Sequence, residues 1–104
     1  MEIRGRHALI TGGGSGIGAA IASDLCAAGA NVMIAGRRED RLQQVVDQVH
    51  ASGGQISYRV TDIAQPAECT ALVDAAVQAY GPVDILVNNL GIYEPKGFFD
   101  IPDS

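Results

Sequence analysis

The order of apolar segments along the chain constrains its fold more than any other feature of the sequence. Four short apolar runs have the length of buried β-strands, at residues 7–11, 30–35, 55–60 and 83–88. Segments with apolar residues at helical spacing separate them, at residues 17–28, around 42–49, and from 66 to Gly81-Pro82. Strands that alternate with helices through short links form a parallel sheet with helices on its faces. The sequence therefore predicts one α/β domain.

Glycine and proline residues mark the ends of the predicted helices. Gly29 follows the first helical pattern and can provide a left-handed stop, and Gly53-Gly54 closes the second. Pro66 suits the first position of the third helix, but Gln65 before it is a poor cap. We therefore expect the start of that helix to be the least sharply encoded boundary.

Composition excludes several classes of function. With 104 residues and 47% apolar side chains, the chain is long enough for one compact core. A formal charge of -5 argues against non-specific binding to nucleic acid or to an anionic membrane. No apolar run has the length of a membrane span or the pattern of a signal peptide, so we expect a cytoplasmic protein. The two cysteines lack metal-ligand spacing, and we expect no metal site.

The predicted topology places a ligand crevice between distant segments. Right-handed crossovers favour a doubly wound, Rossmann-type sheet with the strand order 3-2-1-4 in three αβα layers. Ligands bind such sheets beyond the carboxyl ends of the strands where the order reverses. Here those ends are Thr11-Gly12 and the segment 88–91, and both contain glycine. The same topology puts Cys26 and Cys69 on opposite faces of the sheet, too far apart for a disulfide.

The glycine-rich link after the first strand has the properties of a phosphate-binding loop. Gly12 can make the sharp turn, Gly16 can let the backbone approach a pyrophosphate, and Gly18 can let the helix pack on the sheet. The helix that follows directs free N–H groups and the positive end of its dipole at the anion, and Ser15 can add a hydroxyl donor. A ligand that carries phosphate is therefore expected.

Three segments together resemble the short-chain dehydrogenase/reductase family: Thr11-Gly12-Gly13-Gly14-Ser15-Gly16-Ile17-Gly18, Asp62-Ile63 and Asn88-Asn89-Leu90-Gly91. The resemblance covers residues 5 to about 104 and corresponds to the first half of a family member. It implies that four residues hold the cofactor pyrophosphate, namely Gly12, Ser15, Gly16 and Ile17. It also implies that Asp62 and Ile63 contact the adenine, and that Asn89 and Gly91 lie on the ribose side. One departure is Leu90, where the family usually has Ala.

The residues after the second strand favour NADP(H) over NAD(H). A carboxylate at this position would bind the ribose 2′-hydroxyl of NAD, whereas arginine suits the 2′-phosphate of NADP. The sequence is Gly36-Arg37-Arg38, with no carboxylate before Glu39. We expect Arg37 to be the main contact. Arg38 is as readily explained as a solvated residue at the start of a helix.

Residues that would perform the chemical step are not recognised in this sequence. The family resemblance implies a Ser, and a Tyr with a Lys four residues later, positioned after Ser104. Tyr93 and Lys96 are only three apart, and Pro95 disfavours a helix between them. We therefore expect the catalytic half to be absent and the chain to be a fragment, the product of a truncated reading frame, or the ordered part of a longer enzyme.

Three functional hypotheses remain open on the sequence. The first is the cofactor-binding portion of an NADP-dependent oxidoreductase that acts, when complete, on a small carbonyl compound or secondary alcohol, with a homo-oligomer possible. The second is a stand-alone NADP(H)-binding regulatory module without catalysis. The third, a methyltransferase with an adenosyl cofactor, is weaker, because Arg37 and Arg38 would then face an uncharged ribose.

Overall fold

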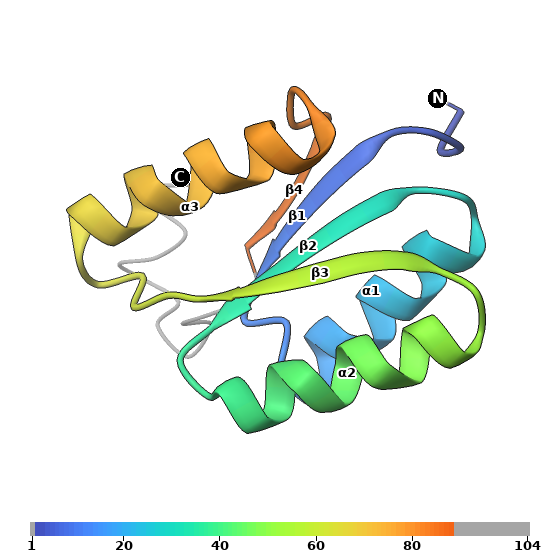
Figure 1. Ribbon diagram of the computed structural model, residues 1–104, viewed down its shortest axis with the longest axis horizontal. Helices are drawn as coiled ribbons and strands as arrows, with labels where there is room; N and C mark the ends of the chain where they lie inside the picture. Colours follow the sequence, from blue (N-terminus) through green and yellow to red (C-terminus); the bar gives the residue numbers. More distant parts are fainter. Residues whose placement is uncertain (1, 89–104) are drawn as a thin grey trace, which may run out of the picture.

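The computed structural model describes residues 2–88, and its helices and strands alternate along the chain (Figure 1). The strands are β1 (His7–Thr11), β2 (Asn31–Gly36), β3 (Gln55–Val60) and β4 (Ile85–Asn88). The helices are α1 (Gly16–Ala27), α2 (Glu39–Ala51) and α3 (Pro66–Tyr80). Every predicted element is present. Asn89, Gly91 and the Tyr93–Lys96 pair lie outside the described residues.

The four strands form a parallel sheet in the order β3-β2-β1-β4, which confirms the predicted doubly wound topology. Helices α1 and α2 cover one face of the sheet and α3 covers the other (Figure 1). In the register of β1, Thr11 pairs with Ala35 on one side and with Asn88 on the other. The carboxyl ends of the three strands therefore lie together at one edge.

Local hydrogen bonds shift three predicted boundaries by one or two residues. Helix α1 begins at Gly16 because the hydroxyl of Ser15 caps it, accepting from the backbone N–H of Gly18 at 3.1 Å. Strand β2 begins at Asn31, since the N–H of Ala30 still closes the end of α1. Strand β4 begins at Ile85 rather than at residue 83. There the carboxylate of Asp84, and not a backbone carbonyl, accepts from the N–H of His7 at 2.9 Å.

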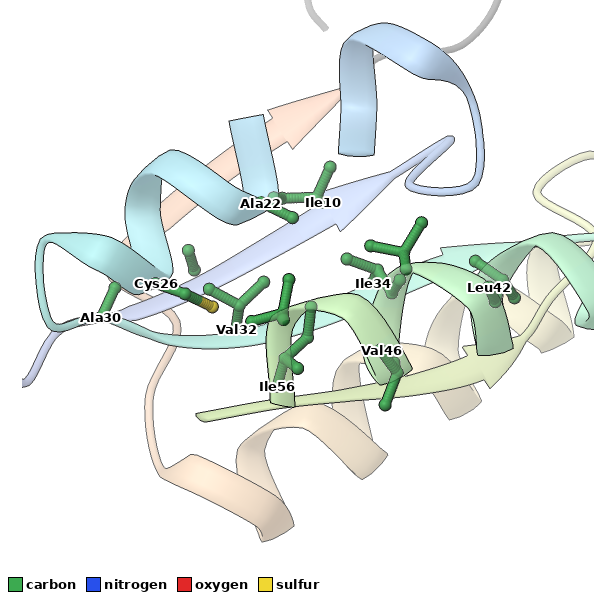
Figure 2. Packing of buried hydrophobic residues seen from close by; sticks show 12 residues of the cluster. Ile10, Ala22, Cys26, Ala30, Val32, Ile34, Leu42, Val46 and Ile56 are labelled. Atoms are coloured by element: carbon green, nitrogen blue, oxygen red, sulfur yellow. The ribbon is translucent and has the colours of Figure 1, made fainter. Parts of the chain in front are cut away.

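The larger core lies between the sheet and helices α1 and α2 (Figure 2). Ile10 and Ile34 from the central strands and Leu42 from α2 are fully buried in it. The side chain of Cys26 also packs here, and burial raises the pKa of its thiol. This core holds both α1 and α2 against the strands that carry the glycine-rich link and the arginines.

The smaller core lies on the opposite face, under α3. It contains Leu9, Met33 and Ala35 from the sheet and Leu72 and Ala76 from the helix. Half-buried Cys69 belongs to α3, so the two cysteines lie on opposite faces of the sheet, as predicted.

Strand β4 is less covered than its neighbour. Leu86 is 65% exposed, although its register partner Leu9 on β1 is buried under α3. Within residues 2–88, β4 pairs with β1 and with no other strand. None of the helices in this range is long and apolar enough to cross a membrane.

A tyrosine on β3 connects the sheet to the first two turns of α2. The hydroxyl of Tyr58 donates to Oε2 of Glu39 at 2.8 Å and lies 3.0 Å from Oε1 of Gln43. The hydrogen bond to the Glu39 carboxylate raises the pKa of the Tyr58 phenol, because ionisation would place a second negative charge beside the first. This contact fixes the carboxylate of Glu39 on the β3 side of the helix.

We expect Glu39→Gln to lower the pKa of Tyr58 towards its ordinary value. Because the folded-state pKa is raised, the contact stabilises the fold fully below about pH 10 and ceases to do so as the pH rises through the raised pKa. Ultraviolet titration of wild type, Glu39→Gln and Tyr58→Phe isolates this phenol by difference. Identical titration curves for wild type and Glu39→Gln would contradict the assignment.

Replacing Gly13 by alanine is expected to destabilise the fold by about 1–3 kcal/mol, because overpacking a core forces side chains and backbone to move. A Cβ at this position would lie 2.5 Å from Cβ of Ile34, which is buried. Gly16→Ala is the matched control, since a Cβ there meets nothing within 4 Å in the part of the chain that the structure describes. Urea unfolding should show a loss of stability for Gly13→Ala alone. Equal midpoints for the two variants would be incompatible with the close approach.

Candidate functional site

The glycine-rich link is attached to the end of the neighbouring strand. Gly12 has φ 73°, a left-handed conformation that glycine adopts without strain, and it makes the sharp turn predicted for it. The N–H groups of Gly12 and Gly13 both donate to the carbonyl of Ala35, at 2.8 and 3.1 Å. The link is therefore held against the carboxyl end of β2, although more than twenty residues separate the two in sequence.

Gly13 has a role that the sequence analysis missed. A side chain there would collide with Ile34, so this glycine allows the link to cross directly over β2. Gly14 has a similar role towards α2, because a Cβ on it would lie 3.1 Å from Cβ of Arg41. The run of three glycines was the available signal, but only the packing distinguishes a glycine needed for close approach from one needed for a turn.

Two of the residues predicted to hold a pyrophosphate, Gly16 and Ile17, lie in the first turn of α1. Within residues 2–88, a Cβ on Gly16 would meet nothing within 4 Å, and Ile17 is 68% exposed. Gly18, which belongs to α1, is buried, and its predicted role in packing the helix on the sheet stays a prediction. The hydroxyl of Ser15 donates to the carbonyl of Gly12 at 2.9 Å and caps the helix. Its predicted contact with phosphate stays a prediction.

Strands β1 and β4 are joined at their carboxyl ends by side chains. The hydroxyl of Thr11 donates to Oδ1 of Asn88 at 2.9 Å. This bond fixes the start of the glycine-rich link relative to the last described residue of β4. The predicted ribose-side residues, Asn89 and Gly91, follow directly and lie outside the described residues.

A hollow of about 240 Å³ lies between the glycine-rich link and the start of α2. It is lined by Gly12, Gly14, Ser15, Gly36, Arg37, Arg38, Arg41 and Leu42. Four residues predicted from the sequence thus share one cavity: Gly12, Ser15, Arg37 and Arg38. Arg41 was missed, because it is not one of the apolar residues at helical spacing in the second helix, and the sequence does not show which surface it faces. An arginine at this register was visible in the sequence, but its proximity to Gly14 was not.

The arginines of the hollow differ in their partners. Nη2 of Arg38 lies 3.5 Å from Oδ2 of Asp40, and both side chains are largely exposed. Such an exposed ion pair contributes at most about 1 kcal/mol. Elsewhere in residues 2–88, neither Arg37 nor Arg41 pairs with a carboxylate. The hollow therefore combines apolar and backbone surface with an excess of positive charge, which suits an anion.

Asp62 and Ile63 follow β3 at the same edge of the sheet but do not line the hollow. The N–H of Asp62 donates to Oε1 of Glu68 at 2.7 Å, and Oδ1 of Asp62 accepts from the N–H of Ala64 at 3.0 Å. The carboxylate thus shapes the turn into α3. The predicted adenine contact of these two residues stays a prediction.

Comparisons with known proteins agree with this geometry. The family model described as short chain dehydrogenase matches residues 6–104. The uncharacterized oxidoreductase YvaG of Bacillus subtilis is 46% identical over 105 residues, which cover 99% of this chain and 38% of the relative. The chain therefore spans well under half the length of that relative.

Solved structures share the fold over the same region. A variant of the actinorhodin polyketide ketoreductase with NADPH has a TM-score of 0.80 and 41% identity, over 83% of this chain and 33% of that one. A short chain dehydrogenase/reductase from Burkholderia phymatum in complex with NAD has a TM-score of 0.80 and 37% identity, over 83% of this chain and 31% of that one.

The family model covers nearly the whole chain. The solved relatives share the fold over most of the chain, in which a glycine-rich link follows the first strand of a parallel sheet. The chain therefore belongs to the short chain dehydrogenase family and contains a cofactor-binding region of that family.

Proposed function

We propose that this chain is the NADP(H)-binding portion of an oxidoreductase that transfers hydride to or from a carbonyl compound or a secondary alcohol. The observation that carries the proposal is the hollow beside the glycine-rich link, where three arginine residues face one cavity. Membership of the family supports oxidoreductase chemistry. Because the chain spans 38% of the relative from B. subtilis, that activity is proposed for the protein to which these residues contribute the cofactor site.

The charges favour the phosphorylated cofactor. Relatives are solved with NADPH and with NAD, so membership of the family does not choose between the two. Arginine forms charge-assisted, forked hydrogen bonds with phosphate, each contributing about 1.5–3 kcal/mol. The carboxylate nearest in sequence to Arg37 and Arg38 is that of Glu39, and Tyr58 binds it on the other side of the helix. The surroundings of the hollow thus favour the 2′-phosphate of NADP(H) over a free 2′-hydroxyl.

The remaining predicted contacts complete the proposed site. The N–H groups at the start of α1 would hold the pyrophosphate, and within residues 2–88 nothing lies within 4 Å of a Cβ placed on Gly16. Asp62 and Ile63 would flank the adenine, and Asn89 and Gly91 the ribose side. When bound, the nicotinamide supplies or accepts the hydride. The residues of this chain bind and orient the dinucleotide.

We expect the 104-residue chain to bind NADPH more tightly than NADH, and Arg37→Asp to remove that preference. The aspartate takes away a phosphate contact and adds a repulsive charge, so NADPH affinity should fall at least about tenfold while NADH affinity is retained. Isothermal calorimetry on the folded variants measures both. Arg6→Gln removes one positive charge at the opposite end of β1 and is the control. An unchanged NADPH/NADH ratio in Arg37→Asp would falsify the assignment.

Gly16→Ala is expected to weaken both cofactors by about tenfold without changing their ratio, because a methyl group would occupy the space left for the pyrophosphate. The same variant should be as stable as wild type, since its Cβ meets no atom of residues 2–88 within 4 Å. Calorimetry combined with urea unfolding separates the two effects. Full affinity for both cofactors would show that this glycine does not face the dinucleotide.

A further inference from the structure

We propose that Arg41 is a specificity-determining residue, which binds the 2′-phosphate of NADP(H) together with Arg37 and contributes more than Arg38. This inference rests on the function proposed above. It assigns a role to a helix residue that is not one of the apolar residues at helical spacing, and it ranks the three arginines of one cavity.

Packing fixes the position of Arg41. The next residue, Leu42, is fully buried in the larger core and lies close to Gly36, where a Cβ would be 3.5 Å from its side chain. On the other side, the Cβ of Arg41 lies against Gly14 of the glycine-rich link. Packing on both sides thus fixes the backbone and the Cβ of Arg41, and its exposed side chain lines the hollow.

The carboxylates nearest to Arg41 in sequence, those of Glu39 and Asp40, are bonded to other residues. Asp40 binds Arg38 at 3.5 Å, so Arg38 must give up this partner or share it with a phosphate. The carboxylate of Glu39 is held by Tyr58, on the β3 side of α2. Within residues 2–88, no carboxylate pairs with Arg41, whose guanidinium can therefore take an incoming anion without exchanging a partner.

The position of Arg41 in α2 also runs against local helix preferences. The helix begins at Glu39, so Arg41 lies in its first turn, near the positive end of the helix dipole. Cations are unfavourable there, and residues that break a local rule tend to lie at functional sites. A bound phosphate would offset this cost, because it places two negative charges among Arg41, Arg37 and the start of the helix.

The experiment measures how strongly each arginine contributes to recognition of the phosphate. The probes are adenosine 2′,5′-bisphosphate and 5′-AMP, which differ only in the 2′-phosphate. Calorimetry gives the ratio of their dissociation constants for the 104-residue chain and for Arg41→Gln, Arg41→Lys and Arg38→Gln. Arg6→Gln is the control for net charge, and circular dichroism with thermal melting verifies the fold.

For wild type we expect the bisphosphate to bind more tightly than 5′-AMP. Arg41→Gln should reduce that preference about tenfold, Arg41→Lys by less, and Arg38→Gln and Arg6→Gln by less than about twofold. The affinity for 5′-AMP should stay the same in Arg6→Gln, and in the other variants it should change less than the affinity for the bisphosphate. The melting temperature of Arg41→Gln should equal or exceed that of wild type, because the substitution removes a cation from the first turn of the helix.

Two failures are distinguishable. If wild type shows no preference for the bisphosphate, the NADP(H) assignment fails, and the role of Arg41 falls with it. If wild type shows the preference but Arg41→Gln keeps it, or Arg38→Gln loses as much, only the role of Arg41 is overturned. Should Arg41→Gln not fold, Arg41→Lys decides, since an undiminished ratio in that variant would overturn the proposal.

Discussion

The crossing of the glycine-rich link over β2 is the constraint on which the rest of the site depends. Two N–H groups, from Gly12 and Gly13, share the carbonyl of Ala35, and Ile34 leaves no space for a side chain on Gly13. This contact holds the glycine-rich link, and with it the start of α1, against the carboxyl end of β2. The glycine-rich link therefore lies beside the arginines at the start of α2, and together they line one hollow.

The charged residues in the first turn of α2 face different neighbours. Glu39 contacts β3 through Tyr58, whereas Arg41 packs against Gly14 of the glycine-rich link. The chain as a whole carries a net negative charge of -5, yet the hollow is lined by three arginines. Local geometry, and not net charge, therefore determines the charge at this edge. The same arrangement shows how an acidic protein can carry a local excess of positive charge beside its glycine-rich link.

Much of the fold could be predicted from the sequence, because its signals are local. The glycine after α1 adopts the left-handed conformation expected of a helix stop, with φ 98° at Gly29, and the apolar spacing of α2 matches its buried face. Boundaries were less predictable. Strand β4 begins two residues late because the carboxylate of Asp84 takes the N–H of His7, a contact between residues 77 positions apart. The place of Arg41 beside the hollow could not be predicted for the same reason, since Gly14, which it contacts, is distant from it in the sequence.

By itself, the sequence determined the order of the elements, the parallel sheet with its reversal between β1 and β4, and the family, because periodicity and glycine positions act within a few residues. The tertiary structure alone decided which glycine avoids a collision, which arginines face one cavity, and which carboxylates are engaged elsewhere. These properties depend on distances between side chains of different elements. Such distances are set by how α1 and α2 pack on the sheet, which no local pattern encodes.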